Sequence, residues 1–378
     1  FGSIFYLGSP LHDGATIASA TFGLAGWPEE IALQMEKNFL ETGHPRDITH
    51  IHAAGVGDWK GRGECHWSHD GMMTKFIGSH AGSSPKLFKQ ISDNKILAWN
   101  LPLGTMIQVF REAGRRAPGV LSKTGLGTFI DPRFDGGKLN PLTKEKGEDL
   151  VKYIPDFEGE EYLFYKAWPL DFGFMRGTTA DENGNITCEK EALNLEMLSV
   201  AQAVKANGGT VIVQVESLAK AGTLNPKLVK VPGIYVDYIV VAEDPENIMQ
   251  TQGTKFNRSF CGEVKVPIKQ ALPAIPLDEK KVMVRRAVME IKAGYKANFG
   301  IGTPTFAGNV MAEEGCDDLI TMISESGSIG GVPGGGLDFG AHWNIEASCD
   351  QGEHFSFFDG GGLDFGLFGL SEVDKDGN

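Results

Sequence analysis

Helix and strand patterns alternate along much of the chain, and this alternation constrains the fold more than any other feature. An amphipathic pattern over residues 193–209 ends in Asn-Gly-Gly, and the apolar run TVIVQV at 210–215 follows at once. The run ATIASA at 15–20 precedes another helical pattern, which opens at Pro28 with two glutamates behind it. A further strand pattern covers 235–242. This rhythm predicts an α/β fold with an open, mostly parallel sheet covered on both faces.

Three prolines interrupt the pattern within residues 263–276, and we predict a linker there. Asp278 then precedes a new helical pattern at 279–294, after which strands and helices alternate again. Gly-Trp-Pro in the first half and Gly-Thr-Pro in the second each lie between a strand pattern and a helix pattern, which hints at two similar domains. The predicted domains are therefore 1–262 and 277–378.

Composition and charge exclude several classes of partner. The net charge of −14 at pH 7 argues against nucleic acid or an anionic membrane surface as the main partner. Apolar runs fall short of the ~20 residues that span a bilayer, and no signal peptide is visible. Five scattered cysteines without a C-x-x-C pair favour a reducing cytoplasm over a disulfide framework. Because the chain begins at Phe1 and stops at Asn378 within a turn signal, we expect a fragment of a longer protein.

The glycine-rich loops do not match the common nucleotide-binding motifs. None completes G-x-G-x-x-G or G-x-x-x-x-G-K-[ST], so a nicotinamide site and a P-loop are disfavoured. The loop GIGTP at 300–304 is the best ligand candidate, because it joins a strand pattern to a helix N-terminus; a plain turn is the alternative. His66-x-x-His69 has the spacing of a metal pair, but no acidic or Cys partner has firm ligand spacing. We therefore expect no metal at these histidines.

Glu325 is the strongest candidate for chemistry. It lies between two serines, after the apolar run LITMI at 319–323 and before a stretch rich in glycine. The run is a buried parallel strand by pattern, and ligands bind at the C-terminal ends of such strands. No cationic residue lies nearby in the sequence, and the small neighbours leave space around the carboxylate. This setting is typical of a nucleophile or a general base, with a solvent-facing loop glutamate as the alternative.

Several motifs together resemble family I coenzyme A-transferases. SESG at 324–327, with IGGVP behind it, resembles the active-glutamate motif of that family, and DGATIASATFGLAGWP at 13–28 resembles its N-terminal signature. Further similar stretches are GLGTFIDPRFDGGKLN, KVPGIYVDYIVVA, EEGCDD and FFDGGGLDFGLFGLSEVDKDGN. The resemblance covers nearly the whole chain and is strongest to the single-chain propionate or acetoacetate CoA-transferase branch.

The resemblance implies an enzyme that transfers coenzyme A between short-chain carboxylic acids. Glu325 would attack an acyl-CoA thioester, and the reaction would proceed in ping-pong order through a glutamyl-CoA thioester. Gly300 and Gly302 of the GIGTP loop would line the coenzyme A site. The implied fold is two similar open α/β domains, the second incomplete in this chain. Coenzyme A would be the co-substrate and no metal or redox cofactor would be needed. The oligomeric state stays open, with a homo-oligomer as one alternative.

Leu103 departs from the family pattern. The family usually has Gln followed by Gly at this place, with the Gln touching the reacting carboxylates, so Leu103 implies different substrate contacts or weaker transfer. Two alternatives stay open beside transfer: hydrolysis of acyl-CoA through the same glutamate, and binding of CoA esters without catalysis. The sequence does not separate acetate, propionate, butyrate, lactate and acetoacetate as the acid.

Overall fold

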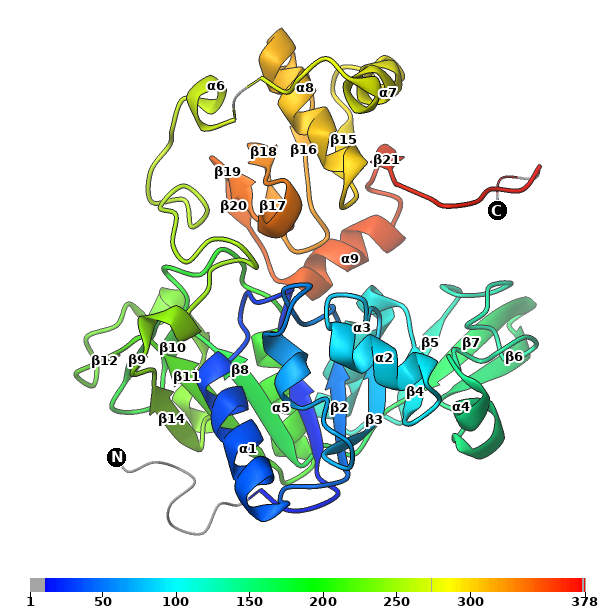
Figure 1. The fold of residues 1–378 in the computed structure, drawn as a ribbon, viewed down its shortest axis with the longest axis vertical. Helices are drawn as coiled ribbons and strands as arrows, with labels where there is room; N and C mark the ends of the chain where they lie inside the picture. The colour runs from blue at the N-terminus through cyan, green and yellow to red at the C-terminus, as the bar shows by residue number, and fades with distance from the viewer. Residues whose placement is uncertain (1–10, 273, 376, 378) are drawn as a thin grey trace. The chain divides into compact units, whose positions relative to one another are not determined.

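The computed structural model of the protein describes residues 11–272, 274–375 and 377. The described residues divide into two compact units, one holding 11–189 and 195–249 and the other 190–194 and 250–377 (Figure 1). The linker boundary at 263–276 stays a prediction. The turn signal at the chain end falls on Asp376 and Asn378, which lie outside the described residues.

The first unit is built on a sheet of seven described strands in which every neighbouring pair runs parallel. The spatial order is β14-β11-β8-β1-β2-β3-β4. The strands are β1 (Thr16–Ser19), β2 (Ile48–His52), β3 (Met73–Gly78), β4 (Leu97–Asn100), β8 (Phe172–Arg176), β11 (Thr210–Val215) and β14 (Tyr238–Val241). The prediction of an α/β fold with a large parallel sheet is confirmed, and the run TVIVQV is β11 in full.

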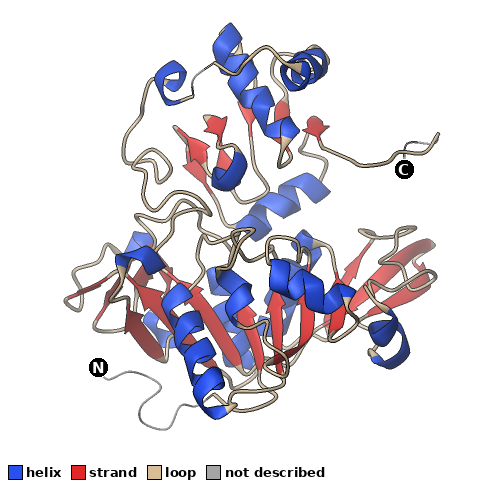
Figure 2. Ribbon diagram, viewed as in Figure 1, coloured by secondary structure: helices blue, strands red, loops and turns tan. Residues whose placement is uncertain are grey.

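Helices flank this sheet, as Figure 2 shows. They are α1 (Glu29–Thr42), α2 (Pro85–Ser92), α3 (Leu103–Gly114), α4 (Pro141–Lys146) and α5 (Met197–Ala206), with 3-10 turns η1 (Gly63–His66), η2 (Pro226–Leu228), η3 (Gly233–Tyr235) and η4 (Pro245–Asn247). Helix α1 has two acidic residues in its first turn and ends at Gly43 in the left-handed conformation, as its dipole and C-cap favour. Its buried Ile31 and Met35 share one core with Leu87 and Ile91 of α2. Helices α3 and α5 pack against each other, and α5 lies on β1, β8 and β11.

Two smaller sheets complete the described part of the first unit. Strands β5 (Gly119–Ser122), β7 (Glu160–Lys166) and β6 (Val151–Phe157) form an antiparallel sheet in that spatial order. Strands β12 (Ser217–Ala219), β9 (Thr179–Asp181), β10 (Ile186–Thr187) and β13 (Val229–Val231) form the other. An Asn-Gly turn joins β9 to β10, and Gly184 has the positive φ of 85° that such a turn requires.

The second unit contains a smaller parallel sheet of order β16-β15-β21 among its described residues. Its strands are β15 (Lys296–Phe299), β16 (Thr321–Met322) and β21 (Phe365–Leu367), and antiparallel pairs join β17 (Ser328–Ile329) to β20 (Ala347–Ser348) and β18 (Val332–Pro333) to β19 (His342–Trp343). The helices are α6 (Ile268–Ala271), α7 (Glu279–Val288), α8 (Phe306–Glu314) and α9 (Gln351–Asp359), with 3-10 turns η5 (Thr303–Thr305), η6 (Asp317–Leu319) and η7 (Gly336–Asp338). Helices α7 and α8 pack together.

Of two local predictions in the second unit, a helix start is confirmed and a strand was predicted too long. The side chain of Asp278 caps α7 by accepting a 2.9 Å hydrogen bond from the backbone of Lys281, so the predicted helix start is confirmed. The run LITMI was expected to be one strand, but only Thr321–Met322 pairs as β16. Leu319 instead ends the 3-10 turn η6 and is 53% exposed. The strand is therefore shorter than its apolar run.

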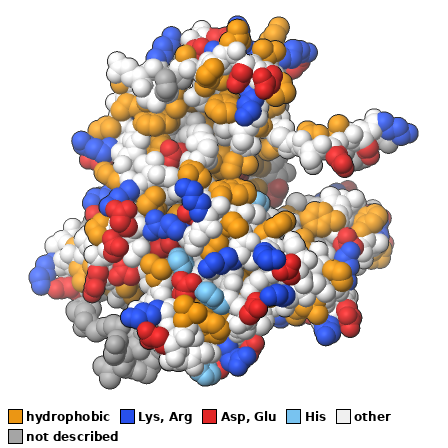
Figure 3. Space-filling view, viewed as in Figure 1, with side chains coloured by type: hydrophobic (Ala, Val, Ile, Leu, Met, Phe, Trp, Pro, Cys, Tyr) orange, Lys and Arg blue, Asp and Glu red, His pale blue; other side chains and the backbone are white. Residues whose placement is uncertain are grey.

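The surface carries charges of both signs. Figure 3 shows Lys and Arg side chains interspersed with Asp and Glu over the face that it displays. Charges mixed in this way keep a protein surface hydrated without creating a large field of one sign. In the described part of the chain, every helix is too short or too polar to cross a bilayer.

Candidate functional site

Glu325 lies in a tight turn shortly after β16. Ile323, which follows the strand, forms an isolated bridge with Ile329 on the other side of that turn. The backbone of Gly327 donates a 3.0 Å hydrogen bond to the carbonyl of Ser324, which closes the turn around Glu325. Because β15 and β16 run parallel, their C-terminal ends lie at the same edge of the small sheet. Glu325 is partly exposed, whereas Ser324 and Ser326 on either side are buried. The structure thus places this carboxylate at a strand end, as the sequence predicted.

Asn298 of β15 holds the Glu325 carboxylate. Its side-chain nitrogen donates a 2.9 Å hydrogen bond to Oε2 of Glu325 and a 3.1 Å hydrogen bond to the carbonyl of Ile323. Burial raises the pKa of the Glu325 carboxyl, and the Asn298 hydrogen bond partly offsets that rise. A carboxylate with a raised pKa is a stronger nucleophile once ionised, because its charge is less well solvated.

Buried hydrogen bonds fix the turn on both sides of Glu325. Ser324 Oγ lies 2.6 Å from Nε2 of His342, and Nδ1 of His342 lies 2.8 Å from the carbonyl of Gly330. A carbonyl only accepts, so Nδ1 carries the hydrogen and Nε2 accepts from the Ser324 hydroxyl. Burial lowers the pKa of His342 to about 4, which keeps the ring neutral in this role. The hydroxyl of Ser326 donates a 2.6 Å hydrogen bond to the carbonyl of Gly340.

Gly327 closes the turn in a conformation that only glycine adopts easily. Its φ is +106°, and a Cβ there would lie 2.3 Å from the carbonyl oxygen of Cys349. The backbone of Cys349 in turn donates a 3.0 Å hydrogen bond to the carbonyl of Gly327. Gly327, two residues after Glu325, therefore permits a close approach of two backbone segments.

Gly300 and Gly302 lie at the same sheet edge as Glu325, in the loop after β15. Gly302 has a φ of +87°, and a Cβ added there would have no atom within 4 Å, whereas the amide of Gly300 donates to the carbonyl of Leu367 on β21. The Gly302 carbonyl accepts a 2.6 Å hydrogen bond from the Thr305 hydroxyl at the start of η5 and α8. The loop thus joins a strand to a helix as predicted, and its exposed part is Gly302 rather than Gly300.

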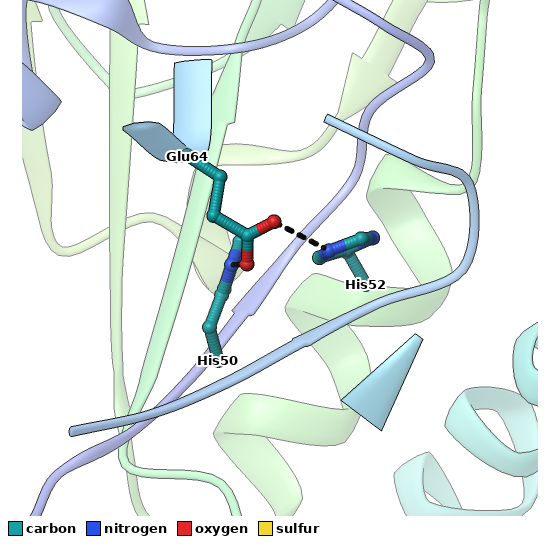
Figure 4. Close-up of side chains that lie close together, drawn as sticks. All are labelled: His50, His52 and Glu64. Carbon is teal, nitrogen blue, oxygen red and sulfur yellow. Dashed lines mark hydrogen bonds and ion pairs between the residues drawn. The ribbon is translucent and has the colours of Figure 1, made fainter. Parts of the chain in front are cut away.

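Two pairs of histidines in the first unit each contact a shared glutamate. His66 and His69 both contact Glu36 of α1, at 2.5 and 2.6 Å, so His66-x-x-His69 has an acidic partner that the sequence spacing did not reveal. A separate group consists of His50 and His52 on β2 and Glu64 on η1, shown in Figure 4. Burial acts to raise the pKa of Glu64, but the adjacent His52 and His50 outweigh it and hold that pKa at about 2.

The family model for coenzyme A transferase matches residues 8–242, more than half of the chain. The chain belongs to this family. Among curated proteins, this coenzyme A transferase is 46% identical to the caffeate CoA-transferase of Acetobacterium woodii over 366 residues, which cover 97% of this chain and 69% of that protein. It is 40% identical to the acetate CoA-transferase YdiF of Escherichia coli (strain K12) over 340 residues, covering 90% of this chain and 63% of YdiF.

Solved structures agree with these matches. The apoenzyme of the acyl-CoA transferase YdiF from Escherichia coli O157:H7 superposes with a TM-score of 0.88 at 36% identity, over 98% of this chain and 68% of that one. The thioester complex of the same protein with CoA has a TM-score of 0.87, over 97% of this chain and 72% of that one. This coenzyme A transferase chain therefore spans about two thirds of the length of the relatives it matches.

Two residues of the candidate site were missed in the sequence of this coenzyme A transferase. Asn298 is a polar residue between Ala297 and Phe299 in the strand KANF, and a polar side chain between two apolar ones in a strand is a signal that could have found it. His342, between Ala341 and Trp343, gave a similar signal. Both side chains are less than 4% exposed and hydrogen-bonded to the turn that carries Glu325.

Proposed function

We propose that the protein to which this chain belongs is an acyl-CoA:carboxylate CoA-transferase in which Glu325 is the nucleophile. The observation that carries the proposal is the Glu325 carboxylate itself, partly exposed at a parallel-sheet edge and oriented by Asn298. Family membership and the caffeate and acetate CoA-transferases among its relatives support the reaction class. A solved relative that forms a thioester complex with CoA supports a covalent route.

The proposed reaction has two covalent exchanges before the acceptor enters. An oxygen of the Glu325 carboxylate attacks the thioester carbonyl of acyl-CoA, and the C–S bond breaks to give an acyl-glutamyl anhydride and the CoA thiolate. The thiolate then attacks the glutamyl carbonyl, which forms the glutamyl-CoA thioester and releases the first carboxylate. A second carboxylate runs the same steps in reverse, so that acyl-CoA of the new acid leaves and Glu325 is restored.

The surroundings of Glu325 suit these steps. A carboxylate is a weak nucleophile, so the reaction depends on fixed alignment and on donors for the developing oxyanion. The Asn298 amide supplies alignment, and the hydrogen bonds of Ser324 and Ser326 hold the turn still. Exposed Gly302 at the same edge is the residue of the GIGTP loop that we propose approaches coenzyme A. Binding energy from the unreactive part of coenzyme A would then be available for the chemical step.

Short-chain carboxylic acids are the proposed substrates, with acetate and propionate as the first candidates. The experiment is a matrix of acyl-CoA donors and free-acid acceptors on the full-length protein, followed by mass analysis of the peptide that contains Glu325. We expect CoA to be attached to that peptide when acyl-CoA is added without acceptor. A folded, active protein whose Glu325 peptide is never modified would contradict the mechanism, and turnover with aromatic acids alone would contradict the substrate class.

The same matrix of acyl-CoA donors and acceptor acids distinguishes CoA transfer from hydrolysis and from binding without catalysis. Release of free acid from acyl-CoA without any acceptor would identify a hydrolase, which the Leu103 departure makes worth measuring. Binding of CoA esters with neither turnover nor covalent label would identify a non-catalytic protein.

A cytoplasmic location and a homo-oligomeric state are also part of the proposal. The cytoplasmic location is supported by the five cysteines, which are all free thiols. Light scattering of the purified protein tests the homo-oligomeric state.

A further inference from the structure

Cys349 and His354 form a thiol–imidazole pair in the second unit. The sulfur Sγ of Cys349 lies 3.2 Å from Nδ1 of His354, which is a hydrogen-bond distance for sulfur. Cys349 follows strand β20, and His354 lies in the first turn of α9. Cys349 is partly exposed, whereas His354 is buried. The short connection between this strand and this helix therefore places a partly exposed thiol against a buried base.

The resting pair is a thiol and a neutral imidazole. Burial lowers the pKa of His354, which favours the uncharged ring. Among the described residues, Nε2 of His354 has no hydrogen-bond partner, so no hydrogen bond from that nitrogen stabilises a charged ring. Asp350, which caps α9 next to Cys349, adds a negative charge that disfavours a permanent thiolate. A neutral imidazole with its lone pair on Nδ1 accepts the thiol hydrogen and is able to take the proton when the sulfur reacts.

Two other partly exposed cysteines of the same unit hold their thiols against carbonyl groups. Sγ of Cys261 lies 3.4 Å from the carbonyl oxygen of Arg258, and Sγ of Cys316 lies 3.5 Å from that of Met311. A carbonyl oxygen accepts a hydrogen bond but does not take the proton from a thiol. Burial raises the pKa of both thiols, which lowers their reactivity. Cys261 and Cys316 are therefore internal references for Cys349.

Cys349 is also bonded to the turn that carries Glu325. Its backbone amide donates a 3.0 Å hydrogen bond to the carbonyl of Gly327, and its Sγ lies 3.6 Å from the same oxygen. The amide of Gly327 donates in turn to the carbonyl of Ser324 and closes the turn around Glu325. A group bonded to Sγ of Cys349 therefore alters the contacts of the turn that holds the proposed nucleophile.

We propose that Cys349 is a site of reversible oxidation by small peroxides, with His354 as the base that accepts its proton. The sulfur attacks one oxygen of hydrogen peroxide, so that an S–O bond forms and the O–O bond breaks. The thiol proton passes to Nδ1 of His354 and then to the departing hydroxide, which leaves as water. Sulfur is oxidised to a sulfenic acid, and the peroxide is reduced. Two molecules of a small thiol restore Cys349, the first by forming a mixed disulfide with loss of water and the second by exchange.

Alkylation compares the three thiols within one wild-type molecule. The full-length protein is treated with limiting iodoacetamide, and mass analysis follows each cysteine peptide with time. We expect Cys349 to react about tenfold faster than Cys261 and Cys316. His354→Gln should slow Cys349 to about the rate of these two references, whereas His44→Gln, at an exposed site in the first unit, should not. Equal rates for the three thiols in the folded wild type, or a Cys349 rate that does not depend on His354, would overturn the proposal.

Peroxide treatment of the wild-type protein tests the oxidation itself. One sample then receives dimedone, which traps sulfenic acid, and another receives dithiothreitol. We expect trapped sulfenic acid at Cys349 ahead of Cys261 and Cys316, and its absence at Cys349 would overturn the proposal.

The effect of this oxidation on CoA transfer rests on the proposed function of Glu325. The transfer rate should fall in step with the sulfenic acid and return with dithiothreitol, and Cys349→Ser should keep its own untreated rate in peroxide. Sulfenic acid at Cys349 with unchanged transfer would overturn the link to Glu325. A protein that transfers no CoA before treatment would contradict the proposed function instead, and the alkylation and trapping results would still decide the oxidation site.

Discussion

The side-chain amide of Asn298 donates a 2.9 Å hydrogen bond to the carboxylate of Glu325, linking strand β15 to the turn that follows β16. The same nitrogen donates to the carbonyl of Ile323, so the amide is anchored to the strand that leads into the turn. This pairing fixes one carboxylate oxygen, Oε2, in place. It also counters the effect of burial on the Glu325 pKa.

Asn298→Ala is expected to slow CoA transfer about tenfold at pH 7, because a hydrogen bond to a charged group contributes about 1.5 kcal/mol or more. Without the amide, one of the two hydrogen bonds that oppose the effect of burial on Glu325 is lost, so its pKa rises further and the acid limb of the kcat/KM profile moves to higher pH. The matched control is Asn309→Ala on α8, which should leave both rate and profile unchanged. A slower variant with an unshifted acid limb would contradict the assigned contact.

Glu325→Ala is expected to lower the transfer rate by at least about 10³-fold, since it removes the proposed nucleophile. Glu325→Asp retains a carboxylate but withdraws it by one methylene, and we expect a loss of about 10²-fold from this misplacement. Rates are measured with acetyl-CoA and propionate on the full-length protein. Glu290→Gln, an exposed glutamate in the same unit, serves as the control. Near-normal transfer by the Ala variant would remove Glu325 from the mechanism.

Acidification from pH 7 to 4.5 is expected to destabilise the second unit through His342. Burial lowers the pKa of His342 to about 4, below the ~6.5 of an exposed histidine, so the unfolded chain binds the proton more readily. The stability due to the neutral ring is complete above pH ~6.5 and is lost as the pH falls toward 4, by at most about 3 kcal/mol. The urea midpoint at several pH values measures this loss.

His342→Gln should flatten that pH dependence, although the variant itself is expected to be less stable at pH 7. Burial also lowers the pKa of His354 in the same unit, so part of the dependence should remain. His44→Gln, at an exposed site in the first unit, is the control and should keep the wild-type dependence. If the His342 variant loses stability on acidification as steeply as the wild type, the ring is not the group that titrates.

Gly327→Ala is expected to cost about 1–3 kcal/mol of unfolding free energy and to reduce transfer. Alanine at this position would have both a strained φ of +106° and a Cβ at 2.3 Å from the Cys349 carbonyl oxygen. Gly335→Ala is the matched control, because its φ is −93° and the nearest atom to its Cβ would be 3.9 Å away. The control should stay within about 0.5 kcal/mol of wild type. Equal effects of the two substitutions would contradict the close approach.

Local patterns predicted much of the fold. The run TVIVQV became β11 in full, and Asp278 became the cap of α7, because an apolar run and a capping residue act over a few neighbouring residues. The run LITMI was predicted too long, since strand length depends on the partner as well as on the run itself. Only Thr321 and Met322 find ladder partners on β15. Where such a strand ends depends on its pairing with another strand that is distant in the sequence. The segment by itself does not carry that information.

The candidate site was predicted only in part. Glu325 was found because its strand, its small neighbours and its isolation from cations are all visible within ten residues. Asn298 and His342 are 27 and 18 residues away from the residues that they contact in the turn, and the tertiary fold alone brings them there. Glu64 meets His50 and His52 from 14 and 12 residues away for the same reason.

The path of the chain between the two compact units limits how they could be separated. Residues 190–194 belong to the second unit, although residues on both sides of them belong to the first. Within the second unit, Asn194 bonds to Ser348, and the Lys190 carbonyl accepts a hydrogen bond from Gln250. A gene split after codon 249 would therefore leave five residues on the wrong polypeptide. Dividing the chain there into two subunits would make the contacts of those five residues, such as Asn194 with Ser348, contacts between two polypeptides.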